Sequence, residues 1–281
     1  MKYIKNNKLL ILLISIIFIV IIIYNSKYEL FTSNNDLVIV TSHYNEDLEW
    51  LKQSKWQVIV CDKPGAAVSS FKPDPKCTLN VNKGREASVY LKYIIENYDN
   101  LPNKIAFIHG HENSVHQKYP KGILQAIEDA KINDFDFISL NNLIHLKKDA
   151  NTTPIVPIHT KSQIFEEQPG IYNELRRIWP NTFASIFGPN IPEYFRIEVG
   201  AQFIVSRKAI YKHDKSVYEK LYNFVIEPNE NEYIRAIIME FIWHMLFTYS
   251  NNDMCNNRDD KDLYYSCNDE SYRKSRFNYI E

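Results

Sequence analysis

Glycine is scarce in this chain, which has only 7 glycines among 281 residues. So few flexible positions argue against a loop-dominated or repetitive architecture. The charges nearly cancel, with a formal net charge of −1, so no overall field favours nucleic acid and we expect no nucleic-acid partner. An apolar fraction of 45% is ordinary for a globular protein. The length beyond the first 35 or so residues suits one large domain.

Cysteine is also rare, and none of the four cysteines stands in a C-x-x-C pair. A structural zinc site is therefore not expected. Two local disulfides, Cys61–Cys77 and Cys255–Cys267, fit an oxidising compartment. Four free thiols fit the sequence equally well, and both alternatives stay open.

One hydrophobic run stands near the N-terminus, where residues 9–24 are apolar apart from Ser15. At about 1.5 Å per residue the run reaches about 24 Å, and the residues at its rim extend it towards the thickness of a bilayer. Three lysines precede the run, so the positive-inside rule predicts a cytoplasmic N-terminus and a lumenal or extracellular domain. A cleaved signal peptide is the alternative, but no small-x-small cleavage site follows the run.

The whole chain is expected to divide into five segments. They are a cytoplasmic tail at 1–8, a transmembrane signal anchor in the lipid bilayer at 9–26, a stem at 27–36, a globular domain at 37–250 and a C-terminal arm at 251–281. An N-glycosylation sequon at 151–153 gives weak further support for a lumenal domain.

Short apolar runs rich in β-branched residues predict buried strands within the domain. These runs lie at 37–42, 56–61, 104–109, 134–140 and 201–206. Helical periodicity predicts helices at 85–98, 120–131, 207–222 and 231–249, and the last of these is so apolar that it must be largely buried. Residues 141–200 contain six prolines and are expected to form long loops. Strands that alternate with helices indicate an α/β domain with a mainly parallel sheet and helices on both faces.

Polar side chains follow the predicted strands, at the edge where ligands of open α/β sheets bind. His43 follows the first strand and Asp62 follows the second. His109, His111 and Glu112 follow the third, and they are candidate ligands for a divalent metal such as Mn²⁺ or Mg²⁺. Hydrogen bonding of these histidines to a sugar or a phosphate is an equally good interpretation. For His43 or Asp62 alone, an ordinary polar loop is the simplest one.

Two ionisable residues share one face of the last predicted helix, because Glu240 and His244 are four residues apart. Such a pair in an apolar helix is costly unless its members bond to each other or lie in a polar cleft. The pair is therefore either a buried structural contact or a general base, Glu240, with His244 beside it.

The first long helix opens with Asn82, Gly84 and Arg85. Backbone N–H groups at a helix start, together with an arginine, can hold a phosphate, so these residues are candidates for binding a phosphorylated cofactor. The alternative is that Asn82 caps the helix and Arg85 pairs with a neighbouring acid.

Five segments together resemble a family known as domain of unknown function 3431, which is common in fungi and occurs in large DNA viruses. They are IVTSHYNEDLEWL at 39–51, NKGREASVYL at 82–91, FIHGH at 107–111, AQFIVSR at 201–207 and EFIWH at 240–244. The resemblance covers most of the domain, and the family name supplies no activity.

The same order of segments is similar to that of distant GT-A glycosyltransferases. The resemblance implies a Rossmann-like GT-A domain in which the acid at 62 touches the nucleoside of a nucleotide-sugar donor and Glu240 serves as base. It also implies an Asp-x-Asp metal site after a strand, where this chain has His109-Gly110-His111. Asp134-Phe135-Asp136 matches the Asp-x-Asp pattern, but it begins a predicted strand instead of following one. Metal dependence therefore stays open.

These observations favour a membrane-anchored glycosyltransferase that moves a sugar from a nucleotide sugar to a glycan or protein acceptor. A metal-dependent hydrolase or phosphoesterase is the first alternative, because histidines with a glutamate suit that chemistry. A non-catalytic sugar-binding membrane protein of the same fold is the second, because the Asp-x-Asp is missing.

The lysine-rich tail generates the first prediction. In microsomes, the domain from residue 37 onward should resist added protease and become digestible only after detergent opens the membrane. Digestion without detergent would show that the topology is wrong. Deletion of residues 9–26 is the control, because it should release the domain from membranes.

Overall fold

The computed structural model describes residues 37–113, 121–141, 155–157, 169–191, 194–196, 200–228, 232–248 and 278. The predicted anchor, the stem, the sequon and nearly all of the C-terminal arm lie outside the described residues. Within those residues, no helix combines the length and the apolar character that a membrane crossing needs.

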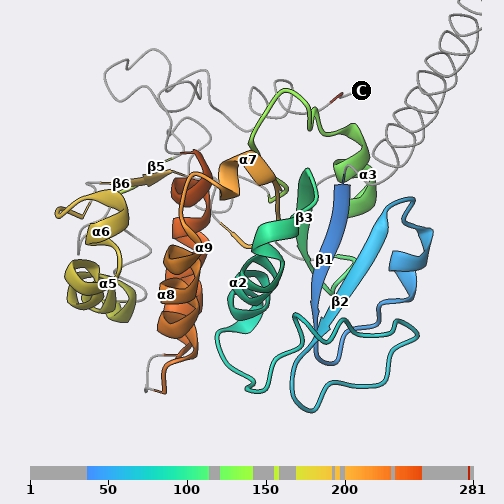
Figure 1. The fold of residues 1–281 in the computed structure, drawn as a ribbon, viewed down its shortest axis with the longest axis horizontal. Helices are drawn as coiled ribbons and strands as arrows, with labels where there is room; N and C mark the ends of the chain where they lie inside the picture. The colour runs from blue at the N-terminus through green and yellow to red at the C-terminus, as the bar shows by residue number, and fades with distance from the viewer. Residues whose placement is uncertain are drawn as a thin grey trace, which may run out of the picture.

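A five-stranded sheet forms the centre of the domain (Figure 1). In spatial order its strands are β2 (Gln57–Asp62), β1 (Leu37–His43), β3 (Lys104–His109), β7 (Phe203–Ser206) and β4 (Phe137–Ser139). β1 pairs in parallel with β2 and β3, whereas β7 is antiparallel to both β3 and β4. All strands except β7 therefore point the same way. The α/β class is confirmed, and the sheet is mixed because of β7.

The five predicted strands are all present, and burial explains why they could be read from apolar runs. Every residue of β1 is buried, as are the four central residues of β3 and all of β7. Strands covered on both faces have no polar alternation. A separate two-stranded sheet pairs β5 (Ile155–Pro157) with β6 (Tyr194–Arg196) in antiparallel fashion.

The helices pack around the sheet (Figure 1). The α-helices are α2 (Arg85–Asn97), α3 (Gly122–Asp129), α5 (Pro169–Thr182), α6 (Ala184–Phe187), α7 (Arg207–Ile210), α8 (Lys215–Ile226) and α9 (Glu232–Thr248). Two short 3₁₀ helices, η1 (Glu49–Gln53) and η2 (Tyr98–Asn100), follow β1 and α2.

Helices α2 and α9 cover one face of the sheet with aromatic side chains. Tyr90 of α2 lies over Phe107 of β3, with ring centroids 4.6 Å apart. Trp243 of α9 lies 5.4 Å from Phe203 of β7 and 6.1 Å from Tyr90. Each such ring buries on the order of 200 Å², so this cluster fixes both helices against the sheet. The prediction that the last helix is largely buried is confirmed.

The predicted helix at 207–222 is wrong in extent, because the chain breaks there into α7 and α8. α7 ends after one turn, and α8 begins after Asp214, whose backbone is extended. Within the break, Nε2 of His213 lies 2.9 Å from the carbonyl oxygen of Leu246 in α9. This tertiary contact fixes the turn, and helical periodicity along the chain does not report it.

The expectation of long loops over 141–200 is wrong for the stretch that α5 and α6 occupy. Pro180 suggests a loop, but it falls inside α5, in the last turn of the helix. The helix forms because it buries an apolar face made of Ile171, Leu175, Ile178 and Trp179.

A buried ion network joins α5 to α8 and α9. Arg235 of α9 is 3% exposed and donates to Glu174 of α5 at 3.1 Å and to Glu227 after α8 at 2.7 Å. Hydrogen bonding from Arg177 lowers the pKa of Glu174, against the opposing effect of burial, and Arg235 lowers it further. Loss of one partner would leave a buried charge unpaired, so the network fixes the position of α5.

A disulfide joins Cys61 at the end of β2 to Cys77 in the loop that follows, 16 residues away. Both cysteines are fully buried. The structure therefore favours the disulfide alternative for this pair, whereas Cys255 and Cys267 lie outside the described residues.

Replacing both Cys61 and Cys77 by alanine should lower the free energy of unfolding by about 3 kcal/mol, because the bond closes a loop of about this length. Urea-induced unfolding measures the loss. An unchanged urea midpoint would contradict the stabilising role of the bond. Peptide mapping without reductant is the control that the wild type is oxidised.

Candidate active site

The carboxyl ends of β1, β2 and β3 lie side by side at one edge of the sheet, the lower edge in Figure 1. His43, which ends β1, is in register with Asp62, which ends β2. Ser42 is in register with His109, which ends β3. Ligands of open α/β sheets bind outside this edge. Asp62 and His109 both lie there, two strand spacings or about 10 Å apart.

The pleat of the sheet sends these side chains to opposite faces. Residues in register share a face, so His43 and Asp62 project from one face. His109 projects from the other, as does Phe107 two residues earlier, and this is the face that α2 and α9 cover. The edge therefore carries two groups of polar side chains.

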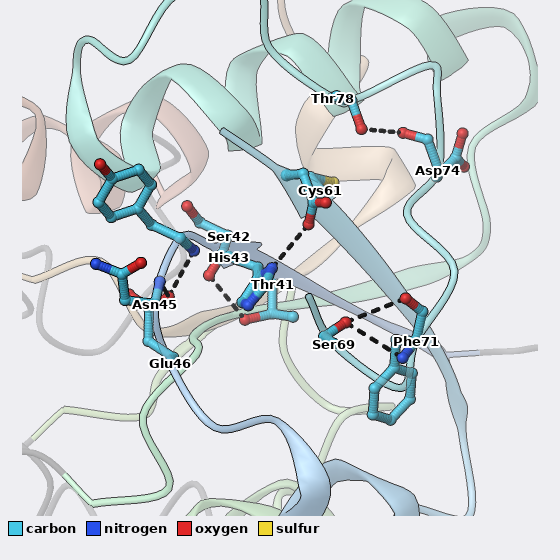
Figure 2. Close-up of polar contacts among 12 residues, drawn as sticks. Thr41, Ser42, His43, Asn45, Glu46, Cys61, Ser69, Phe71, Asp74 and Thr78 are labelled. Carbon is cyan, nitrogen blue, oxygen red and sulfur yellow. Dashed lines mark hydrogen bonds and ion pairs between the residues drawn. The ribbon is translucent and has the colours of Figure 1, made fainter. Parts of the chain in front are cut away.

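The first group is built on a contact between His43 and Asp62. Nδ1 of His43 lies 2.8 Å from Oδ1 of Asp62. A carboxylate only accepts, so the His43 Nδ1–H donates. His43 is 1% exposed, whereas the Asp62 side chain is 23% exposed and reaches the surface. In Figure 2 the His43 ring lies at the end of β1 beside Thr41 and Ser42.

Glu46 holds the turn after β1. Its Oε2 accepts the backbone N–H groups of Tyr44 at 2.6 Å and Asn45 at 3.0 Å (Figure 2). Burial raises the pKa of Glu46, but these N–H groups and the nearby His111 outweigh it and bring the pKa below the ordinary 4.5. Glu46 is therefore ionised at neutral pH and stabilises the turn.

The turns after β1 and β3 pack closely against each other. A Cβ added to Gly110 would stand 2.9 Å from Cβ of Glu46 and 3.0 Å from the Ser42 carbonyl oxygen, so only glycine fits. Nε1–H of Trp50 donates to the Gly110 carbonyl oxygen at 3.1 Å. This packing places His111, whose side chain is 60% exposed, with Nε2 at 3.9 Å from Oε1 of Glu46.

The predicted metal ligands do not gather in the described part of the chain. No three or more His, Cys, Asp or Glu side chains within it are placed to hold a metal ion together. Glu112 is exposed, His109 projects towards α2 and α9, and His116 lies outside the described residues. These residues do not form a complete Mn²⁺ or Mg²⁺ site, and we assign no chemical step to a metal.

The start of α2 carries the predicted phosphate-binding residues. Gly84 is the N-cap, with φ 70°, so Asn82 does not cap this helix. Arg85 follows with φ 48°, a left-handed conformation that strains any residue with a side chain. The Arg85 guanidinium carbon lies 4.5 Å from the ring centroid of Tyr233 in α9. The cation–π contact thus joins the first turns of the two helices.

Glu240 of α9 faces this start of α2. Burial raises its pKa to about 8, with a further rise from the charge of Glu86 and an opposing effect of Arg85. Burial also raises the pKa of Tyr90, one turn along α2 from Glu86, and both glutamates add to that rise. A carboxyl group whose pKa lies near working pH is what a general base needs.

The remaining site residues lie between β3, β4 and α9. His244 is one turn after Glu240 and is 3% exposed. The backbone N–H of His109 donates to Oε1 of Gln202 at 3.3 Å, and Nδ2 of Asn141 donates to the Gln202 carbonyl oxygen at 3.1 Å. Both amide side chains are buried, so they fix the end of β3.

The sequence-predicted residues thus divide between two sides of one edge. Asp62 and His111 lie on the side of the first group, and the side of α2 and α9 carries Arg85, His109, Glu240 and His244. The sequence did not predict that His43 pairs with Asp62. It also did not predict that four further residues lie near the site, namely Glu86, Tyr90, Asn141 and Gln202. Positions 43 and 62 each directly follow an apolar run, at 37–42 and 56–61, and this shared place is the signal that points to the pairing of His43 with Asp62.

Asp136, the last residue of the Asp-x-Asp sequence, lies at the opposite edge of the sheet. Oδ1 of Asp136 accepts the hydroxyl of Ser206, the last residue of the antiparallel β7, at 2.8 Å. Nζ of Lys208 and Nζ of Lys212 lie 3.6 and 3.7 Å from its Oδ2. This aspartate therefore supplies no ligand at the carboxyl edge.

A family model described as a protein of unknown function, DUF3431, matches residues 38–261. The chain belongs to the DUF3431 family. The match spans nearly all of the described domain, including both groups of site residues. No curated protein and no solved structure matches this DUF3431 chain.

The raised pKa of Glu240 generates a prediction on stability. In the unfolded chain this group ionises near 4.5, whereas in the folded DUF3431 domain it keeps its proton up to about 8. Between these pH values the folded state binds more protons, so stability falls as pH rises. Glu240→Gln stays neutral and should gain stability over the wild type as pH rises, by several kcal/mol at pH 9, since each pKa unit corresponds to about 1.4 kcal/mol.

Urea unfolding of both proteins from pH 5 to 9 measures this difference. Glu96→Gln is the matched control, since Glu96 is a surface partner of Lys92 at the far end of α2 and its pKa is lowered by that hydrogen bond. A constant difference between wild type and Glu240→Gln across this range would contradict the raised pKa.

Proposed function

We propose that this protein is a membrane-anchored glycosyltransferase that moves a sugar from a nucleotide-sugar donor to a glycan or protein acceptor. The observation that carries the proposal is the place of Glu240. This carboxyl group has a pKa near 8. Two charges at the start of α2 affect that pKa, because Glu86 raises it and Arg85 lowers it. A base for an acceptor hydroxyl thus stands next to a place where a diphosphate can bind.

The donor would lie across the carboxyl edge. Asp62 would accept hydrogen bonds from the nucleoside, as acids after strands of such sheets do. Arg85 and the backbone N–H groups of the first turn of α2 would bind the diphosphate. His109 and His111 would add hydrogen bonds or positive charge on the same phosphates. The polar groups observed on both sides of the edge support this assignment.

The proposed step is an inverting transfer. Glu240 in its carboxylate form takes the proton from an acceptor hydroxyl, and the hydroxyl oxygen bonds to the anomeric carbon of the donor. The bond between that carbon and the diphosphate oxygen breaks, and the nucleoside diphosphate leaves with the electron pair. Arg85 and the α2 N–H groups stabilise the charge on the leaving oxygen.

The same proposal places the domain on the lumenal or extracellular side of a membrane, with residues 9–26 as an uncleaved anchor. The Cys61–Cys77 disulfide supports this side, because disulfides persist in oxidising compartments. The lysines before the hydrophobic run support the same orientation.

Among the alternatives, a metal-dependent hydrolase would need several clustered ligands, and the described residues contain no such cluster. A non-catalytic sugar-binding protein of the same fold would bind ligand without turnover. Glycosyl transfer uses both the base and the diphosphate position, and it is the function that this arrangement supports best.

Turnover of a panel of UDP- and GDP-sugars, with and without Mn²⁺, tests the proposal. Glu240→Gln should lower turnover by about 10² or more with nucleotide binding little changed, because it keeps the shape and removes the base. Wild-type turnover should rise with pH up to about 8, as the Glu240 carboxylate forms. Glu96→Gln is the control and should keep wild-type turnover.

Two results would overturn the proposal. A folded Glu240→Gln variant with wild-type turnover would remove Glu240 from the mechanism. Nucleotide binding without turnover of any donor and acceptor pair would favour the sugar-binding alternative.

A further inference from the structure

His43 is a buried histidine that the proposed mechanism does not use. Its side chain is 1% exposed, yet it ends β1 at the edge where ligands bind. Most buried polar side chains in folded proteins have a hydrogen-bond partner. The partner here is Asp62, through the 2.8 Å contact between Nδ1 and Oδ1.

The rest of Asp62 is fixed as firmly as its carboxylate. Its carbonyl oxygen accepts the N–H of Leu79 at 2.9 Å. The preceding residue, Cys61, is bonded covalently to Cys77. The N–H of the following residue, Lys63, donates to the His43 carbonyl oxygen at 3.0 Å. The loop after β2, the disulfide and β1 therefore all hold this one aspartate in place.

The Asp62 side chain is partly open to solvent, at 23% exposure. With Oδ1 held by His43, Oδ2 keeps its capacity to accept from a ligand. The His43 Nε2 atom is buried and has no hydrogen-bond partner within the described residues, so it does not compete for that ligand. A carboxylate that is oriented in advance binds a ligand without the cost of ordering the side chain.

We infer that His43 is a positioning residue, which orients the Asp62 carboxylate to receive the nucleoside part of a nucleotide donor. The inference rests on the proposed function, and it assigns a task to a residue that touches no substrate itself. Nδ1–H of His43 is the atom that acts, and Nε2 has no part in binding.

Two substitutions at His43 separate these atoms. His43→Asn keeps an N–H donor near the position of Nδ1 and removes Nε2. His43→Leu fills a similar volume and removes the donor. His213→Leu is the matched control, because the His213 ring also makes one hydrogen bond, of 2.9 Å, to the Leu246 carbonyl oxygen far from the carboxyl edge.

Calorimetric titration of the folded proteins with UDP, GDP and inorganic pyrophosphate measures the effect. For the nucleotide that the wild type binds, His43→Leu should weaken binding about tenfold, and His43→Asn and His213→Leu should stay within about threefold. Pyrophosphate should bind all variants equally, because His43 acts on the nucleoside end. In an Asp62→Asn background, His43→Leu should cause no further loss, because the two residues act as a unit.

Several results would overturn the inference. Wild-type nucleotide affinity in a folded His43→Leu variant would show that Asp62 needs no positioning. Equal loss of pyrophosphate and nucleotide binding would show that His43 is only structural. A tenfold loss in His43→Asn would assign the task to Nε2. If the wild type binds neither UDP nor GDP, the proposed function falls as well, which distinguishes that failure from failure of His43 alone.

Discussion

The parallel pairing of β1 with β2 and β3 is the constraint on which the rest of the molecule depends. Its register brings His43 to Asp62 and Ser42 to His109, residues that are 19 and 67 positions apart in the chain. β1 and the four central residues of β3 are buried on both faces, so a shift of one residue would move every core side chain of these strands to the opposite face. Core packing and the position of the polar edge are therefore set by the same register.

The junction of α2 and α9 shows how the core positions a charged group. The aromatic cluster of Tyr90, Phe107 and Trp243 presses the two helices together next to the sheet. Glu240 is consequently largely buried beside Glu86, and this burial raises its pKa. Arg85 limits the rise, and its left-handed backbone is the cost of placing a cation at that point.

Much of the fold could be predicted from the sequence, because buried strands and long amphipathic helices have strong local signals. The strands at 37–42 and 104–109 and the apolar helix at 231–249 are examples. The break between α7 and α8 could not be predicted, since it depends on the contact of His213 with α9. α5 could not be predicted either, since Pro180 suggests a loop, whereas the helix forms because it buries an apolar face.

The candidate site could be predicted less completely than the fold. Strand ends pointed to Asp62 and His109, but the sequence did not say that the pleat would separate them. Helix spacing pointed to Glu240, but its neighbours Glu86 and Tyr90 belong to another helix. Residues near a strand end can be read along the chain, whereas their partners depend on register and on helix packing.

A crystal structure of the domain with the nucleoside diphosphate that it binds best tests the central claim most directly. The claim predicts a nucleoside within hydrogen-bond distance of Asp62 and a diphosphate at the first turn of α2, beside Arg85. A nucleotide bound at the opposite edge, near Asp136 and Lys208, would contradict it. So would crystals in which UDP and GDP leave the carboxyl edge empty at saturating concentration.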